Sequence, residues 1–160
     1  MLTKNLLESI RVVKENERKA ADFYAQAAQT TGNSMGRELF EQLSEFEQFH
    51  YERLTALEKQ LETSGDFIYY EGKEFPLPPE IVPRAAQEPQ HQSIMNIISQ
   101  ALGLERQAEQ AYAELARQIT DAQGHAMFRR LSEEEHLHYL ILNEAYWNLT
   151  NLKTWKWSLA

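Results

Sequence analysis

Two glutamate–histidine pairs, Glu47 with His50 and Glu135 with His138, are the residues of this sequence best suited to chemistry. Residues three apart lie on one face of an α-helix, so each pair presents a carboxylate and an imidazole together. Leucines four residues before each glutamate and four after each histidine mark that face as the buried one. This ligand chemistry suits Fe(II), Mn(II) or Zn(II) and indicates a metal site.

Two further glutamates, Glu17 and Glu105, lie on the apolar stripes of their own predicted helices. A lone inward glutamate is more often a hydrogen-bonded structural residue, because an unpaired buried carboxylate is costly. Four carboxylates together, however, balance two divalent cations. A glutamate from each of two helices and Glu-x-x-His from each of two others is the di-iron or di-manganese carboxylate pattern. The predicted ligands are Glu17, Glu47, His50, Glu105, Glu135 and His138.

The set of predicted ligands occurs twice along the chain. Residues 17–51 match residues 105–139 without a gap at an offset of 88, with 14 identities in 35 positions. Only two copies are present, so the repeat indicates a duplicated helical hairpin rather than a solenoid. Glu47 and Glu135 are the expected bridges between two ions about 3.5–4 Å apart.

The residues around the ligands carry weaker signals. Tyr24 and Tyr112 lie two helical turns beyond Glu17 and Glu105. They are candidate hydrogen-bond donors to the ligand carboxylates, and a plain core role is the alternative. The remaining glutamates near the pairs are expected to form a solvated face: Glu45, Glu133 and Glu134.

Four helices must hold these residues, and the spacing of apolar side chains predicts them. Ser34 and Asp121 are the expected N-caps of the second and fourth. All five prolines fall between the hairpins, where a ferritin-like bundle needs one long crossover. The predicted fold is an all-α, ferritin-like four-helix bundle in one domain. Its parts are a hairpin at 3–63, a connector at 64–92, a second hairpin at 93–149 and a tail at 150–160.

Composition narrows the function classes. The 160 residues include no cysteine, which excludes disulfides, Cys-ligated zinc and iron–sulfur clusters. The net charge of −8 comes without a basic stripe, so we expect no nucleic-acid partner. We see no signal peptide and no apolar run of about 20 residues, and we therefore expect a cytoplasmic protein without a membrane partner. Trp155 and Trp157 are expected to cover a bundle end or a subunit interface.

The stretches ERKAADFY at 17–24 and LSEFEQFH at 43–50 resemble the rubrerythrin-like branch of the ferritin-like superfamily. Residues 105–112 and 131–138 resemble its second half, and the resemblance covers roughly residues 4–150. It implies a non-haem di-iron centre on the six residues, with manganese or zinc as alternatives. It also implies reaction with hydrogen peroxide or dioxygen, and a homodimer.

The sequence departs from rubrerythrin proper in two ways. It lacks the Cys-ligated rubredoxin domain, so electrons must come from an external donor protein. It also has Ala108 where rubrerythrin has a further glutamate, which raises ferroxidase-like oxidation of Fe(II) beside peroxidase activity. We therefore expect an oxidoreductase of peroxidase or ferroxidase type, acting in oxidative stress or iron homeostasis. The alternatives are an iron-handling or storage component, and a structural di-metal bundle without turnover.

Overall fold

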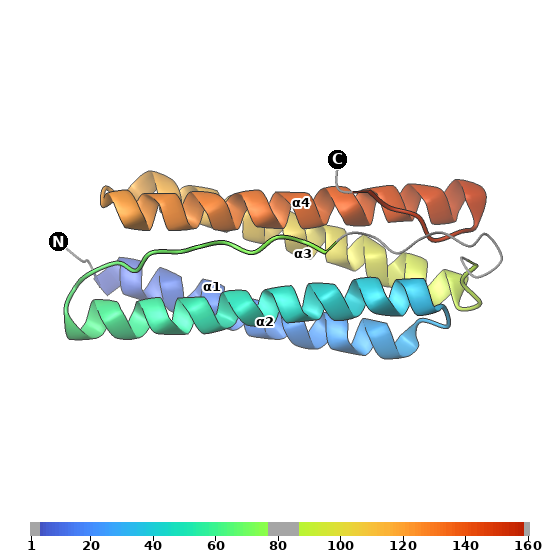
Figure 1. The fold of residues 1–160 in the computed structure, drawn as a ribbon, viewed down its shortest axis with the longest axis horizontal. Coiled ribbons are helices and arrows are strands. Elements are labelled where there is room, and N and C mark those ends of the chain that lie inside the picture. The colour runs from blue at the N-terminus through green and yellow to red at the C-terminus, as the bar shows by residue number, and fades with distance from the viewer. Residues whose placement is uncertain (1–3, 77–86, 159–160) are drawn as a thin grey trace.

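This computed structural model describes residues 4–76 and 87–158, and the described residues form four long helices (Figure 1). Helix α1 packs on α2, α3 packs on α4, and α1 also contacts α3. The predicted all-α bundle of two hairpins is therefore confirmed. The helices are α1 Lys4–Thr30, α2 Ser34–Thr63, α3 His91–Gln118 and α4 Ala122–Leu152.

The helix ends follow local capping chemistry. Asp121 caps α4 as predicted, accepting a hydrogen bond from the Gly124 N–H at 2.9 Å. The predicted cap Ser34 is wrong, because Asn33 caps α2 and accepts from the N–H of Met35 at 2.8 Å. The Asn33 side chain also accepts from the N–H of Gly36, so it satisfies two backbone donors in the first turn of α2. The second hairpin begins at residue 91 rather than 93, and its last helix, α4, continues to 152 rather than 149.

The connector returns the chain along the whole bundle. In Figure 1 its first part, in green, runs between α2 and α4, so that α3 begins at the same end as α2. This is the long crossover that the ferritin-like arrangement requires. Residues 77–86 of the connector lie outside the described residues, as do residue 3 of the predicted first hairpin and residues 159–160 of the predicted tail.

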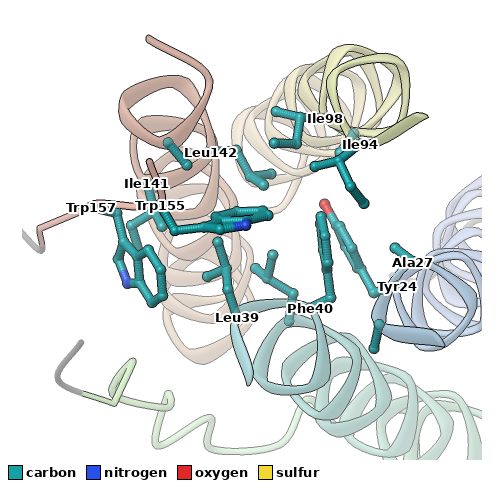
Figure 2. Close-up of a cluster of buried hydrophobic side chains, with 14 of the residues drawn as sticks. Tyr24, Ala27, Leu39, Phe40, Ile94, Ile98, Ile141, Leu142, Trp155 and Trp157 are labelled. Carbon is teal, nitrogen blue, oxygen red and sulfur yellow. The ribbon is translucent and has the colours of Figure 1, made fainter. Parts of the chain in front are cut away.

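Trp155 of the tail is fully buried at one end of the bundle, and Figure 2 shows it between α2 and α4. Its ring meets Phe40 edge-on, with the centroids 5.8 Å apart. Gly36 makes room for it, because a Cβ there would lie 2.4 Å from the Trp155 ring. The indole N–H donates to the buried Glu88 at 3.2 Å. The tail is thus part of the core and covers a bundle end.

A polar layer divides the core into two apolar clusters. One cluster surrounds Phe40 and Trp155, and the other surrounds Leu54 and Phe128. On every helix, the predicted ligands fall between residues of the first cluster and residues of the second. Among the described residues, no helix has the length and apolarity that a membrane crossing requires.

Candidate metal centre

All six predicted ligand residues lie in this polar layer and are at most 2% exposed. Glu17 comes from α1, Glu105 from α3, and each Glu-x-x-His pair from α2 or α4. Each helix is continuous through the layer, so its helical geometry fixes where these side chains emerge. The fold therefore brings the complete predicted set together at the centre of the bundle.

The six residues form two overlapping groups, each offering four ligand atoms within 4.8 Å of one another. Glu47 and Glu135 belong to both groups, in the positions expected of bridging carboxylates. Each of two ions bound in this way would have one imidazole ligand. The first group is Glu17, Glu47, His50 and Glu135, and the second is Glu47, Glu105, Glu135 and His138.

The two imidazole rings turn the same nitrogen toward the carboxylates. His50 Nδ1 lies 3.0 Å from Glu135 Oε1 and 3.5 Å from Glu17 Oε2. His138 Nδ1 lies 3.3 Å from Glu47 Oε1 and 3.6 Å from the Oε2 of Glu105. The Nδ1 atoms are thus available as ligands, and each Nε2 points away from the layer's centre.

Buried polar atoms without a hydrogen bond test whether the residues fit a metal pair. Within the described residues, each of the six side chains has at least one such atom. Proteins satisfy buried polar atoms almost everywhere, so eight such atoms on six side chains of one layer require an explanation. Two divalent cations would coordinate all of these atoms except His138 Nε2, which points away from the layer's centre, and would balance the four carboxylates, so the donor set fits. The orphan atoms in this layer are Glu17 Oε2, Glu47 Oε1, His50 Nδ1, Glu105 Oε2, both oxygens of Glu135, and both ring nitrogens of His138.

Burial and close packing of charges shift the pKa values of several side chains in this layer. Burial, reinforced by the Glu17 and Glu105 carboxylates, raises the pKa of Glu47 and of Glu135. Burial alone would lower the pKa of His50, but the charge of Glu17 and the hydrogen bond with Glu134 raise it to about 10. Protons therefore neutralise part of the charge that metal ions would otherwise balance.

The two tyrosines donate to ligand carboxylates of the opposite hairpin. Tyr24 on α1 donates to Glu105 on α3 at 2.6 Å, and Tyr112 on α3 donates to Glu17 on α1 at 2.5 Å. Both hydroxyls are deeply buried. Each tyrosine thus fixes the carboxylate across the bundle and leaves the other oxygen free for a ligand.

The prediction that Glu134 faces solvent is wrong, while Glu45 and Glu133 are exposed as predicted. Glu134 is 4% exposed, and its Oε1 lies 2.9 Å from His50 Nε2. The sequence contained two signals for this. Glu134 lies three residues after the buried Leu131, and the repeat aligns it with the apolar Phe46. The run of three glutamates at 133–135 hid both signals.

A cavity of about 310 Å³ opens between α1 and α3 onto the polar layer. Its lining includes Glu17, Glu47 and Glu105, together with apolar side chains. Ala20 and Ala108, which correspond in the two repeats, leave this space open. A longer carboxylate side chain at 108 would project into it. The cavity therefore joins the cluster to the α1–α3 face of the bundle.

Comparisons with known proteins agree with this fold. The family model described as Rubrerythrin matches residues 1–58. A hypothetical protein from Pyrococcus furiosus is structurally similar, with a TM-score of 0.75 and 23% identity over 94% of this chain and 93% of that one. No curated protein matches the sequence. Residues 1–58 are therefore similar to the rubrerythrin family, in agreement with the sequence resemblance, and the Pyrococcus protein shares the fold of both hairpins.

Proposed function

We propose that this protein is a non-haem di-iron oxidoreductase that reduces hydrogen peroxide or dioxygen. The observation that carries the proposal is the layer of six buried side chains with unpaired ligand atoms, arranged as two groups that share Glu47 and Glu135. The rubrerythrin match over the first hairpin supports iron rather than zinc. Zinc has no redox states, so only iron or manganese suits this chemistry.

The protein's own residues would position and shield the centre. A bound iron pair supplies one electron per ion, so that hydrogen peroxide, two electrons and two protons yield two waters. The Tyr24 and Tyr112 hydroxyls hold Glu105 and Glu17 in place through the hydrogen bonds described above. The apolar clusters on either side of the layer restrict water to the cavity side.

The α1–α3 cavity is the proposed entrance for the oxidant. A molecule as small as hydrogen peroxide or dioxygen needs far less than its volume of about 310 Å³. Its inner wall carries carboxylates from three of the six proposed ligands. An oxidant entering there would reach the cluster without displacing a helix.

A ferroxidase or iron-handling role is the second candidate, and the same cavity favours it. Glu17, Glu47 and Glu105 give its inner end carboxylate oxygens, which a divalent cation prefers as ligands. Ala108 leaves the cluster without the additional carboxylate of rubrerythrin proper. Continuous oxidation of many Fe(II) ions per chain would support this candidate, and a single stoichiometric oxidation would support the peroxidase.

The proposal implies partners as well. An external protein would supply electrons, because the described residues hold no second redox centre beside the two overlapping groups. We also propose a homodimer, supported by the exposed Leu140 and Trp147, which lie seven residues apart on α4 and outside the lining of the proposed entrance. Sedimentation of the wild type and a Leu140→Glu/Trp147→Glu variant would test the dimer: an unchanged dimer in the variant contradicts this face.

Stopped-flow absorbance of the anaerobic Fe(II)-loaded protein tests the function. We expect a rapid ferric absorbance with hydrogen peroxide or dioxygen, and its loss in Glu47→Gln. Glu45→Gln is the matched control, because Glu45 lies on the same helix and is exposed. No ferric product with either oxidant contradicts the oxidoreductase and leaves the structural di-metal bundle, in which zinc would stabilise the fold as well as iron.

A further inference from the structure

The two hairpins differ at one position that touches the ligand histidines. Position 46 in α2 is Phe46, and the repeat places Glu134 at the same position in α4. Both side chains are buried. Each faces the histidine of the opposite hairpin: Glu134 contacts His50, and Phe46 contacts His138. The ligand atoms therefore repeat, while the groups behind the two imidazoles do not.

Glu134 is a firmly held partner for His50. Its Oε1 lies 2.9 Å from His50 Nε2 and accepts the Tyr70 hydroxyl at 2.5 Å. Its Oε2 accepts from the Lys73 backbone N–H at 2.7 Å and from Arg130 Nε at 2.9 Å. Four donors on one buried carboxylate fix its position and keep it ionised. The His50 ring is thereby held with its Nε2–H donating to Glu134 and its Nδ1 turned toward the carboxylates of the layer.

His138 has no such support. The Phe46 ring meets it edge-on with centroids 4.4 Å apart, and the Phe75 ring lies 5.6 Å away. Within residues 4–76 and 87–158, its buried Nε2 has no hydrogen-bond partner. Two aromatic rings thus take the place that a carboxylate occupies at the other histidine.

We propose that the two metal positions bind with unequal affinity, the ion at His50 being held tightly and the ion at His138 weakly. This inference rests on the di-metal site of the proposed function. A ligating Nδ1 must carry no proton, so the ring proton must sit on Nε2. At His50 that proton already has an acceptor. At His138 it would be buried against Phe46 and Phe75 without one, which disfavours the metal-bound form.

The connector creates this difference. Tyr70 and the Lys73 N–H both belong to it, and it approaches α4 closely at Gly72, where a Cβ would lie 2.7 Å from Arg130 Nε. Gly72 has φ 75°, a conformation that glycine adopts freely. Because the chain has one connector and two hairpins, only one histidine can receive this support.

The expected size of the effect follows from other metal sites. Partners that hydrogen-bond to ligand histidines typically contribute about 10–100-fold to metal affinity. We therefore expect the ion at His138 to dissociate about 10–100-fold more readily than the ion at His50. Such a position would exchange its ion while its neighbour stays filled.

Zinc binding to the metal-free protein tests the proposal without redox activity. Repulsion between two ions would by itself separate two binding steps, so the test must identify the position. We expect one equivalent of Zn(II), located by anomalous scattering in crystals, to occupy the position at His50. We expect His138→Ala to keep one ion at nearly the wild-type tight affinity, and His50→Ala to bind its remaining ion about 10–100-fold more weakly.

Glu134→Gln is the most specific variant, because it keeps the side chain's shape and removes its charge. It should weaken the tight binding step, whereas the exposed neighbour Glu133→Gln should leave both steps unchanged. Equal occupancy of both positions by the first equivalent, or an unaltered tight step in Glu134→Gln, overturns the inequality while the di-metal site stands. Absence of zinc from both positions overturns the di-metal site itself. The crystal measurement remains decisive if a histidine variant fails to fold.

Discussion

The two hairpins of this protein share their ligands and differ in what surrounds them. Glu17 receives the hydroxyl of Tyr112, and Glu105 receives that of Tyr24, so the two halves support each other reciprocally. A second repeated bond joins Ser44 to the Ala21 carbonyl at 2.8 Å and Ser132 to the Glu109 carbonyl at 3.0 Å. These two pairs of contacts between repeated helices thus keep the two-fold relation.

The relation fails wherever a segment outside the helices takes part. Gly36 admits Trp155 from the tail, whereas the corresponding Gly124 admits Phe67 from the connector. Glu134 meets the connector at Tyr70 and Lys73. The connector and the tail each occur once, so they cannot support two equivalent sites equally. The duplication therefore preserves the ligand layer, and the single segments make its halves different.

The largest expected effect is on metal binding, and it distinguishes the proposed ligands that belong to both groups from those that belong to one. Glu47→Ala/Glu135→Ala removes two carboxylates from each group, because both residues belong to both groups, and we expect metal binding to fall to nearly none. Glu17→Ala/Glu105→Ala removes one carboxylate from each group and should leave weakened binding. Anaerobic equilibrium dialysis with Fe(II) measures both. Equal losses in the two double variants would contradict a shared, bridging role for Glu47 and Glu135.

The two equivalent glycines should differ in their tolerance of a methyl group. An added Cβ at residue 36 meets the fully buried Trp155, and we expect Gly36→Ala to reduce the free energy of unfolding by about 1–3 kcal/mol through overpacking. At residue 124 the Cβ meets the half-buried Phe67, which can move outward, and Ile119, which lies just past the end of α3, so Gly124→Ala should cost less. Denaturant titration of both variants decides; a greater loss in Gly124→Ala goes against this explanation.

The metal-free protein should show stability limits set by His50 and Glu134. The pKa of His50 is raised from its ordinary 6.5 to about 10, so its contribution is complete below 6.5 and is lost as pH rises through 10. The charge and hydrogen bonds of His50, working against burial, lower the pKa of Glu134 from 4.5 to about 2, so its contribution is lost as pH falls through 2. The His50–Glu134 pair therefore contributes most to stability between about pH 4.5 and 6.5.

Thermal melting in the presence of a chelator, from pH 3 to 9, measures this window. Glu134→Gln should flatten the decline on both sides, because it removes one partner of the pair and the group that raises the pKa of the other. A wild-type melting temperature that climbs steadily from pH 6.5 to 9 would be the wrong sign for His50.

The smallest expected effect concerns the symmetric part of the site. Tyr24→Phe and Tyr112→Phe each remove one hydroxyl from a buried carboxylate, and we expect each to lower stability by about 0.5–1.5 kcal/mol. The two losses should agree closely, because the hydrogen bonds are reciprocal. Chemical denaturation of the two variants side by side checks this; clearly unequal losses would break the two-fold relation where we expect it to hold.

The sequence predicted what repeats and failed where single segments act. Helical periodicity and the 88-residue offset predicted the four helices and placed all six carboxylate and imidazole residues in one layer. Glu134 was missed because the run of glutamates at 133–135 obscured its helical spacing, and because its partners Tyr70 and Lys73 belong to a proline-rich connector without helical periodicity. Trp155 was predicted only to cover a bundle end or an interface, since its contact with Gly36 joins residues far apart in the chain.

Metal content tests the central claim most directly. Protein purified anaerobically from iron-replete cells should contain two iron ions per chain, and crystals should show both between the two Glu-x-x-His pairs. The Glu47→Ala/Glu135→Ala variant, prepared in parallel, should contain almost none. A wild-type protein that binds no metal in this layer under either Fe(II) or Zn(II) would contradict the account.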